Sequence, residues 1–467
     1  MASQLFINGQ WCDSSDGAVF DVENPATGEL MGQSADASVE DGVAALNAAV
    51  DAQAEWAATD PRFRGEILRR AFDLVTARSE ELAAQMTAEM GKPLAESRSE
   101  IAYGSEFLRW FSEEAVRVSG RYAQAPSGGT KLVTMKQPVG PCYMVTPWNF
   151  PLAMGTRKIA PAIAAGCTMV IKPAALTPFS MVSLVEILEE AGVPAGVVNL
   201  VTTQRTSAVS TAIIEDPRLR KLTFTGSTEV GRMLVRQSAT SLLRTSMELG
   251  GNAPFIVFDD ADLDKAVDGA MLAKMRNLGE ACTSANRFLV HESVASEFAA
   301  KFAARMSELP LAPLIDAKQR NSVAELVDDA VACGAKVETG GAVPEGAGWH
   351  YPPTVLSNVS RTARIWSEEI FGPVAPIYTF STEAEALALA NDTEYGLVAY
   401  AFTRDHARVV RVYEGLETGM VGINQGVVSN PAAPFGGVKS SGFGREGGFE
   451  GIDEYLNVKY VGFAQPL

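Results

Sequence analysis

Residues 142–171 read CYMVTPWNFPLAMGTRKIAPAIAAGCTMVI, and the pattern of this stretch indicates the class of fold. Two short apolar runs, 142–145 and 168–171, have the length and composition of buried strands. Residues 152–165 between them predict a helix. Strand, helix and strand in succession predict parallel strands in a sheet that is wound with helices on both faces.

The same alternation covers much of the chain. Around the opening stretch it predicts strands at 197–201 and 222–225 and helices at 179–191 and 206–214. A second block predicts strands near 255–258, 287–291, 336–338, 353–356 and 375–380 and helices near 263–276, 294–309 and 318–333. The chain is therefore expected to be α/β with two such domains, and ligands are expected at the carboxyl ends of the parallel strands.

Length and charge narrow the possible classes of protein. A chain of 467 residues is too long for one simple core and predicts two to four domains or subdomains. The net charge of -17 argues against nonspecific binding to nucleic acid or to an anionic membrane. The sequence contains no apolar run of about 18 residues, so we expect no membrane span.

Cysteine and histidine usage indicates the compartment and the absence of a metal. The five cysteines are scattered and form no C-x-x-C pair, which predicts a reducing, cytoplasmic compartment and no disulfide framework. The first residues lack a basic segment followed by a long apolar run, so no signal peptide is expected. The three histidines lie far apart, and we expect no zinc site.

Three residues could carry chemistry, although each has an ordinary alternative. Cys282 lies in NLGEACTSANR (277–287), where small neighbours leave its sulfur free to attack a carbonyl carbon. Glu248 lies in MELGGN (247–252), where paired glycines let the backbone approach a ligand and the carboxylate could activate water. Asn149 follows a predicted strand and could donate to an oxyanion. Taken singly, a buried structural cysteine, a loop acid and a turn asparagine are the commoner roles.

Two loops at predicted strand ends could approach a phosphate or a sugar. The run FTGSTEVG (224–231) joins a strand to a helix and contains Gly226 and Ser227, but it is not G-x-G-x-x-G and is a weak signal alone. Lys172 follows the strand at 168–171, where a solvated charge is the alternative.

Taken together and in order, these runs resemble the aldehyde dehydrogenase family over nearly the whole chain. The matching runs are PWNFP (147–151), FTGS (224–227), ELGG (248–251), Cys282, EIFGP (369–373) and PFGGVKSSG (434–442). The resemblance implies a Rossmann-like cofactor-binding domain (1–119 and 139–248) and an α/β catalytic domain (249–445). It also implies a small β oligomerisation flap (120–138 and 446–467), and with it a homodimer or homotetramer.

The resemblance also assigns roles to residues. Cys282 would attack an aldehyde, Asn149 and the backbone N–H of Cys282 would hold the oxyanion, and Glu248 would activate water to hydrolyse the thioester. The residues implied for the cofactor are Trp148, Lys172, Gly226, Ser227, Glu369 and Phe371. NAD-preferring members often have glutamate where this chain has Ala175, so we expect NADP, with NAD use as the alternative.

Within the family the chain is most similar to succinate-semialdehyde dehydrogenases. The supporting runs are EMGKPLAE (89–96), WFSEEA (110–115), GCT (166–168) and GFGREG (442–447). That resemblance implies that Arg157, Arg276 and Ser429 hold the far carboxylate of the substrate, a task that suits the forked guanidinium. The alternatives are that both arginines are helix-surface charges and that glutarate semialdehyde or another ω-carboxy aldehyde is the substrate.

Three positions depart from the family pattern, and two other classes of function are alternatives. Glu280 replaces the usual glutamine, residues 283–284 exclude a second cysteine beside Cys282, and the connection at 308–315 is short. A non-catalytic relative is disfavoured by the joint presence of Cys282, Glu248 and Asn149. Transfer of the acyl group to coenzyme A is disfavoured because Glu248 favours hydrolysis.

Overall fold

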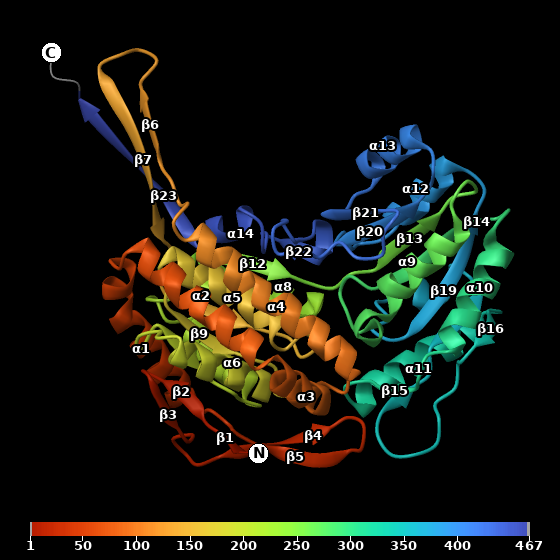
Figure 1. The fold of residues 1–467 in the computed structure, drawn as a ribbon, viewed down its shortest axis with the longest axis horizontal. Coiled ribbons are helices and arrows are strands. Elements are labelled where there is room, and N and C mark those ends of the chain that lie inside the picture. The colour runs from red at the N-terminus through yellow and green to blue at the C-terminus, as the bar shows by residue number, and fades with distance from the viewer. Residues whose placement is uncertain (1, 465–467) are drawn as a thin grey trace.

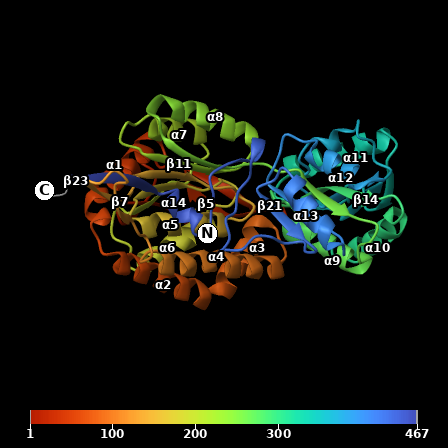
Figure 2. The same cartoon turned by 90° about the horizontal axis from the view of Figure 1, so that it is seen from above.

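The chain folds into two lobes that lie side by side, with a narrow projection from the first lobe (Figures 1 and 2). The structure is a computed structural model and describes residues 2–464. Each lobe is built on a mostly parallel sheet with helices on both faces, so the predicted α/β class is confirmed.

An eight-stranded sheet forms the centre of the first lobe. In spatial order its strands are β22 (Gly442–Phe443), β12 (Arg244–Glu248), β11 (Lys221–Thr225), β8 (Cys142–Val145), β9 (Met169–Lys172), β10 (Val198–Leu200), β2 (Leu5–Ile7) and β3 (Gln10–Cys12). The pairs from β12 to β10 are parallel, and the outer pairs are antiparallel. The carboxyl ends of β8, β11 and β12 therefore meet at one edge.

Two groups of helices cover this sheet (Figure 2). On one face lie α2 (Pro61–Ala77), α3 (Ser79–Met90), α4 (Leu94–Glu114), α5 (Ala153–Ala165) and α6 (Phe179–Glu190), and on the other lie α1 (Val39–Ala57), α7 (Thr206–Ile214) and α8 (Thr228–Ser238). Every residue of α5 is buried, because this helix lies between the sheet and α4. That burial explains why most residues of α5 are small or apolar.

The second lobe contains a seven-stranded sheet that is parallel except at one edge. Its strands, in spatial order, are β16 (Lys336–Thr339), β18 (Thr354–Ser357), β19 (Val374–Phe380), β14 (Ala285–His291), β13 (Ala253–Val257), β20 (Val398–Phe402) and β21 (Met420–Ile423). The helices are α9 (Leu263–Met275), α10 (Ala295–Ser307), α11 (Ala317–Ala332), α12 (Glu383–Asn391) and α13 (His406–Gly415). Separate apolar clusters fill the two faces of the sheet.

The projection is a three-stranded antiparallel sheet. It consists of β6 (Arg121–Gln124), β7 (Thr130–Pro138) and β23 (Leu456–Ala464), and β23 pairs with β7 from Leu456 opposite Pro138 to Ala464 opposite Thr130. The predicted two-stranded excursion and the final strand are therefore parts of one sheet, which extends away from the first lobe in Figure 1.

Three details differ from the sequence analysis. β22 joins the first sheet, although we had assigned Gly442–Phe443 to the second domain. Residues 450–453, which we had assigned to the flap, form the short helix α14 (Glu450–Asp453) against α5. The helix predicted for 263–276 ends at Met275, because Asn277 and Leu278 adopt left-handed backbone angles (φ 53° and 58°).

The remaining strands form two small sheets. β1 (Ala2–Ser3), β5 (Glu29–Ala35) and β4 (Val19–Asn24) form a sheet beside the first lobe, and β15 (Ala312–Pro313) pairs with β17 (His350–Tyr351). Among residues 2–464 we find no helix with the length and apolar character that a membrane span requires.

Candidate active site

A cavity of about 300 Å³ contains most of the predicted site residues. It lies where the carboxyl ends of the first sheet's strands face the second lobe, the place where parallel sheets bind ligands. All the predicted site residues except Lys172 and Ala175 line it. They are Trp148, Asn149, Arg157, Gly226, Ser227, Glu248, Arg276, Cys282, Glu369, Phe371 and Ser429.

Cys282 lies in the segment that leads into β14. The loop is held by a hydrogen bond from Tyr400 Oη to the Thr283 carbonyl (3.0 Å). A side chain at position 251 would put its Cβ 2.3 Å from the Cys282 carbonyl oxygen, so this approach requires Gly251. Burial raises the pKa of the Cys282 thiol to about 12, and the charge of Arg157 acts in the opposite direction.

Glu248 is the last residue of β12 and is 3% exposed. Neither of its carboxyl oxygens has a hydrogen-bond partner within residues 2–464. Burial raises the pKa of Glu248 well above its ordinary value, and the charge of Glu446 raises it further. An unpartnered carboxyl beside a cavity suits proton transfer, because a proton can enter or leave it without breaking a protein hydrogen bond.

Asn149 is buried, and both its side chain and its backbone carbonyl are held by hydrogen bonds. Its side-chain Nδ2 donates to the Glu280 carbonyl (2.9 Å), and its backbone carbonyl accepts from Lys92 Nζ (2.7 Å) and Asn277 Nδ2 (3.0 Å). The side-chain amide has two hydrogens, so one remains for a ligand in the cavity.

Arg276 follows the end of α9 and is not on the helix surface. Its Nη1 lies 3.3 Å from Ser429 Oγ, and its guanidinium lies 5.2 Å from the ring centres of both Tyr103 and Phe150. Within the described part of the chain no carboxylate lies within ion-pair distance of Arg276. A free guanidinium in the cavity can therefore bind a carboxylate of a ligand.

Arg157 differs from Arg276 because it already has an acidic partner. It is 2% exposed, and its Nη2 lies 2.8 Å from Glu446 Oε2. Glu446 also pairs with Lys158, and the Arg157 guanidinium lies 3.9 Å from the centre of the Phe435 ring. The helix-surface alternative is wrong for Arg157, since α5 is buried on all sides. It is also wrong for Arg276, which follows the last residue of α9 and lines the cavity.

Our sequence analysis did not identify Glu446 as a site residue. The run GFGREG contained it, but we used that run only for the family resemblance. Its partners Arg157 and Lys158 lie nearly 300 positions away, so no local spacing connects them.

Glu280 is wholly buried, and its backbone carbonyl helps to hold Asn149 in place. Its Oε1 accepts a hydrogen bond from the Ile315 backbone N–H (3.1 Å), within the short connection at 308–315. Burial raises the pKa of Glu280 well above its ordinary value. The raised pKa favours the protonated form, in which the side chain has a hydrogen-bond donor and an acceptor, as a glutamine has.

The opposite side of the cavity has features that suit a dinucleotide. The Trp148 and Phe371 rings lie edge to face at 5.3 Å, and Glu369 Oε1 accepts from the Gly251 N–H (2.9 Å). A Cβ at Gly226 would lie 2.5 Å from the Phe224 ring, and Ser227 begins α8, whose N–H groups suit a phosphate. These residues fit a nicotinamide cofactor, and they line the same cavity as Cys282.

Gln319 is a second residue that the sequence analysis missed. Phe371 has a positive φ of 51°, which is uncommon for a residue with a side chain. Gln319 Nε2, from α11, donates to the Phe371 carbonyl (2.8 Å) and holds this conformation.

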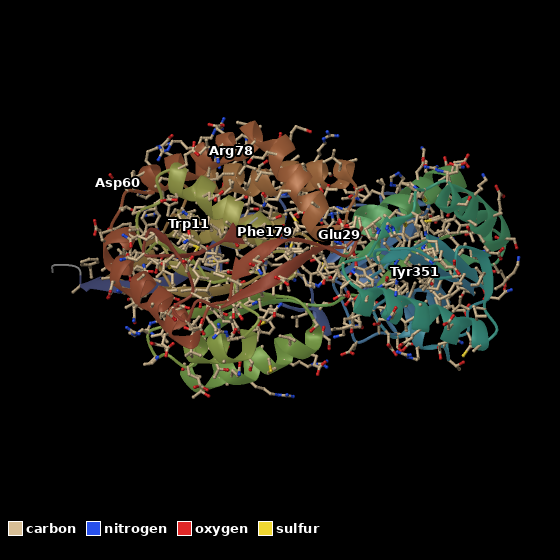
Figure 3. All side chains as sticks on the ribbon, turned by 90° about the horizontal axis from the view of Figure 1, so that it is seen from below. Trp11, Glu29, Asp60, Arg78, Phe179 and Tyr351 are labelled. Carbon is tan, nitrogen blue, oxygen red and sulfur yellow. The ribbon has the colours of Figure 1, made fainter. Side chains whose placement is uncertain are left out.

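Lys172 and Ala175 lie outside the cavity lining. Lys172 ends β9 beside the β8 loop, its Nζ donates to the Pro173 carbonyl (2.9 Å), and burial lowers its pKa to about 8. Ala175 packs against Phe20, Val22 and Phe179, and Figure 3 shows Phe179 near the β4–β5 ribbon. Among residues 2–464 no three acidic, histidine or cysteine side chains gather as a metal site.

A two-lobed α/β fold with a thiol, a free carboxyl and a buried amide around one cavity is the architecture of an aldehyde dehydrogenase. The chain belongs to this family: the family model named Aldehyde dehydrogenase family matches residues 11–461. The predicted family and enzyme class are therefore confirmed.

Individual relatives match along nearly their whole length. Succinate-semialdehyde dehydrogenase of Paenarthrobacter nicotinovorans is 59% identical over 447 residues, 94% of this chain and 99% of that protein. Glutarate-semialdehyde dehydrogenase of Pseudomonas putida is 48% identical over 468 residues, 98% of this chain and 97% of that protein. A crystal structure of an NADP-dependent enzyme from E. coli is 47% identical with a TM-score of 0.98, covering 99% of this chain and 98% of that one.

Proposed function

We propose that this protein oxidises succinate semialdehyde to succinate and prefers NADP as its cofactor. One observation carries the substrate proposal: the Arg276 guanidinium donates a hydrogen bond to the Ser429 hydroxyl in the same cavity as Cys282. It supplies a charged hydrogen-bond donor for a carboxylate at the end of the substrate remote from the aldehyde. The names of the relatives from P. nicotinovorans and E. coli support the substrate and the cofactor.

The proposed reaction begins at Cys282. The thiol gives its proton to solvent water, the resulting thiolate forms a bond to the aldehyde carbon, and the electron pair of the C=O bond moves to the oxygen. The free N–H of Asn149 Nδ2 and the backbone N–H of Cys282 stabilise that oxyanion, and such a donor typically contributes about 3 kcal/mol. When bound, the nicotinamide accepts the hydride whose departure leaves a thioester on Cys282.

Glu248 completes the proposed reaction. Its carboxylate removes a proton from water as the water oxygen attacks the thioester carbon, and the carbon–sulfur bond then breaks to release the acid. The absence of a hydrogen-bond partner for its carboxyl oxygens within residues 2–464 supports this role.

The remaining site assignments are also proposals. We propose that Arg157 joins Arg276 and Ser429 at the substrate carboxylate. Because Arg157 is already paired with Glu446, it would contribute less than Arg276 to the binding of that carboxylate. Trp148, Gly226, Ser227, Glu369 and Phe371 would hold the cofactor, with Lys172 near the adenosine ribose. Ala175 would leave room for a 2′-phosphate that a glutamate would repel.

Glutarate semialdehyde is the second candidate substrate. A relative named for that substrate is 48% identical, and one extra methylene changes specificity by only about 10- to 200-fold. A second cavity has Tyr103, Arg276 and Ser429 in its lining as well, so a longer substrate would meet it at these residues.

The test compares initial rates of reduced-cofactor formation. Succinate semialdehyde, glutarate semialdehyde and neutral aldehydes of matched length are each assayed with NADP and with NAD. We expect the highest kcat/KM with succinate semialdehyde and NADP. Equal kcat/KM for charged and neutral aldehydes would contradict the substrate proposal and leave the enzyme class standing.

We also propose a division of labour among the parts of the chain. Residues 1–119 and 139–248 would bind the cofactor, 249–445 would carry catalysis, and the flap of 120–138 and 446–467 would join subunits into a homodimer or homotetramer. The projecting sheet supports an interface because large apolar side chains are exposed on it, namely Tyr122, Met135, Val458, Tyr460 and Phe463. The chain's five cysteines are all free, and this supports a cytoplasmic location for the protein.

A further inference from the structure

A buried ion pair lies directly behind the loop that contains Asn149. Lys92, in the turn between α3 and α4, has its Nζ 2.5 Å from Oε2 of Glu100 in α4. Both side chains are 0% exposed. The pair therefore has no contact with solvent, although it belongs to neither the cavity lining nor the proposed mechanism.

Each member of the pair also binds the backbone of that loop. Lys92 Nζ donates to the Asn149 carbonyl (2.7 Å), and Glu100 Oε1 accepts from the backbone N–H groups of Leu152 (3.0 Å) and Ala153 (3.1 Å). Leu152, the residue before α5, supplies no side-chain cap, so Glu100 accepts from the N–H groups of Leu152 and of Ala153, the first residue of this helix. The ion pair thus holds residues 149–153 from both ends.

The Asn149 amide is fixed from the other side by the Cys282 loop. Asn277 Nδ2 donates to the carbonyls of both Asn149 (3.0 Å) and Glu280 (2.9 Å). Asn149 Nδ2 donates to the same Glu280 carbonyl (2.9 Å). The backbone carbonyl of Asn149 is therefore held by Asn277 and Lys92, and its side-chain amide is held by the Glu280 carbonyl.

Stability alone is a poor explanation for this ion pair. Replacing a buried ion pair by apolar side chains of similar volume is often neutral or stabilising. An apolar pair would fill the same space, but it would leave the Asn149 carbonyl with one donor fewer and two N–H groups of α5 without an acceptor. The charges of Lys92 and Glu100 therefore fix the orientation of the loop at residues 149–153.

We infer that Lys92 is a positioning residue for the oxyanion donor Asn149, with Glu100 as its counterion. The inference rests on the role proposed for Asn149 above. Without the Lys92 ammonium the Asn149 peptide can rotate toward another donor, and the free N–H of the side chain then no longer points at the oxygen on Cys282. A displacement of about 1 Å at a reacting centre can cost roughly 100-fold in rate.

A double-mutant cycle in the full-length enzyme tests this inference. The kcat for aldehyde oxidation is measured at saturating cofactor and aldehyde for wild type, Lys92→Met, Asn149→Ala and the double variant. We expect Asn149→Ala to lower kcat by about 100- to 1,000-fold and Lys92→Met by roughly 10- to 100-fold. In the Asn149→Ala background, Lys92→Met should change kcat by less than about twofold, since residues that act through one another are not additive.

Controls separate positioning from general damage to the fold. Lys265→Met removes an exposed lysine (78% exposed) and should leave kcat unchanged. Cofactor affinity and the rate of Cys282 alkylation by iodoacetamide should stay at wild-type values in Lys92→Met. If this variant does not fold, Lys92→Met combined with Glu100→Gln removes both charges and takes its place in the cycle.

The possible results are distinct. Losses that multiply in the double variant would overturn the role of Lys92 and leave the proposed mechanism intact. An Asn149→Ala variant with wild-type kcat would instead refute the proposed oxyanion donor and the Lys92 inference with it. A loss of kcat in Lys92→Met that disappears in the Asn149→Ala background supports positioning.

Discussion

The Arg157 guanidinium lies 2.8 Å from the Glu446 carboxylate, and both side chains are buried beside the cavity that contains Cys282. This pairing separates the two arginines that we predicted for substrate binding. Arg157 has its charge balanced by Glu446, whereas the contacts of Arg276 are a hydrogen bond donated to the Ser429 hydroxyl and two aromatic rings. Both charges of the pair influence the pKa of Glu248, and the charge of Arg157 lowers the pKa of Cys282.

Replacement of Arg276 should affect carboxylated aldehydes selectively. Arg276→Gln removes the unpaired guanidinium, and we expect kcat/KM for succinate semialdehyde to fall by about 10- to 100-fold because a charged hydrogen bond is lost. The kcat/KM for a neutral aldehyde of the same length should change little. Arg320→Gln, which alters an arginine over Trp349 outside the cavity, is the matched control. Equal losses for both aldehydes would remove Arg276 from the carboxylate site.

Replacement of the proposed nucleophile should abolish turnover. Cys282→Ala has no thiol to form the covalent intermediate, so steady-state oxidation should be undetectable, while cofactor binding measured by fluorescence titration persists. Cys333→Ala changes an exposed cysteine and should have wild-type kcat. Residual turnover in Cys282→Ala at more than trace level would refute the covalent mechanism.

Removal of the Glu446 charge should shift the pH dependence of thioester hydrolysis. The negative charge of Glu446 raises the pKa of Glu248, and the cations Arg157 and Lys158 lower it. Glu446→Gln removes the first effect and frees the second, so Glu248 should ionise at lower pH. We expect the rising limb of the single-turnover hydrolysis rate to move to lower pH. Glu450→Gln, which changes an exposed residue of α14, is the control, and a shift to higher pH would contradict the electrostatic account.

The buried acid at Glu280 should make stability depend on pH. Its pKa is raised in the folded protein and ordinary in the unfolded chain, so the folded state retains the proton and wild type loses stability as pH rises through this interval. Glu280→Gln has no proton to lose. The stability of this variant relative to wild type should increase with pH by up to about 1.4 kcal/mol per unit.

Chemical denaturation from about pH 5 to about pH 9 measures this difference. The exposed Glu292→Gln variant is the matched control and should follow wild type at every pH. Parallel curves for wild type and Glu280→Gln would show that Glu280 is ionised in the folded protein.

The residue at position 175 should set cofactor preference. Ala175→Glu places a carboxylate where a 2′-phosphate is expected, and we predict that the ratio of kcat/KM for NADP to that for NAD falls by about tenfold or more because like charges repel. Ala175→Gln has nearly the same shape without the charge and should retain most of the ratio. Equal ratios in the two variants would show that volume, not charge, acts at this position.

Most strands and helices at the centre of the two sheets follow from local patterns in the sequence, whereas no element was predicted for residues 1–119, which contain α1 to α4. The predicted helix at 206–214 coincides with α7, and most of the other predicted strands and helices match the observed ones within about two residues at each end, which is the usual uncertainty of such boundaries. Buried parallel strands are short apolar runs, and their helices have a different period, so the two are distinguishable without tertiary information. The grouping of Cys282, Glu248 and Asn149 followed from resemblance rather than from these patterns.

Tertiary structure decided how the charged residues are paired. The direction of Arg276 depends on the left-handed backbone of Asn277 and Leu278, and no periodicity in the sequence marks that turn. Arg157 pairs with Glu446, and Lys92 pairs with Glu100. Both pairs depend on how the helices and loops pack in the folded protein. The physical reason is that a buried charge must find an opposite charge or a polar group within a few ångströms, and only the folded chain determines which groups lie that close.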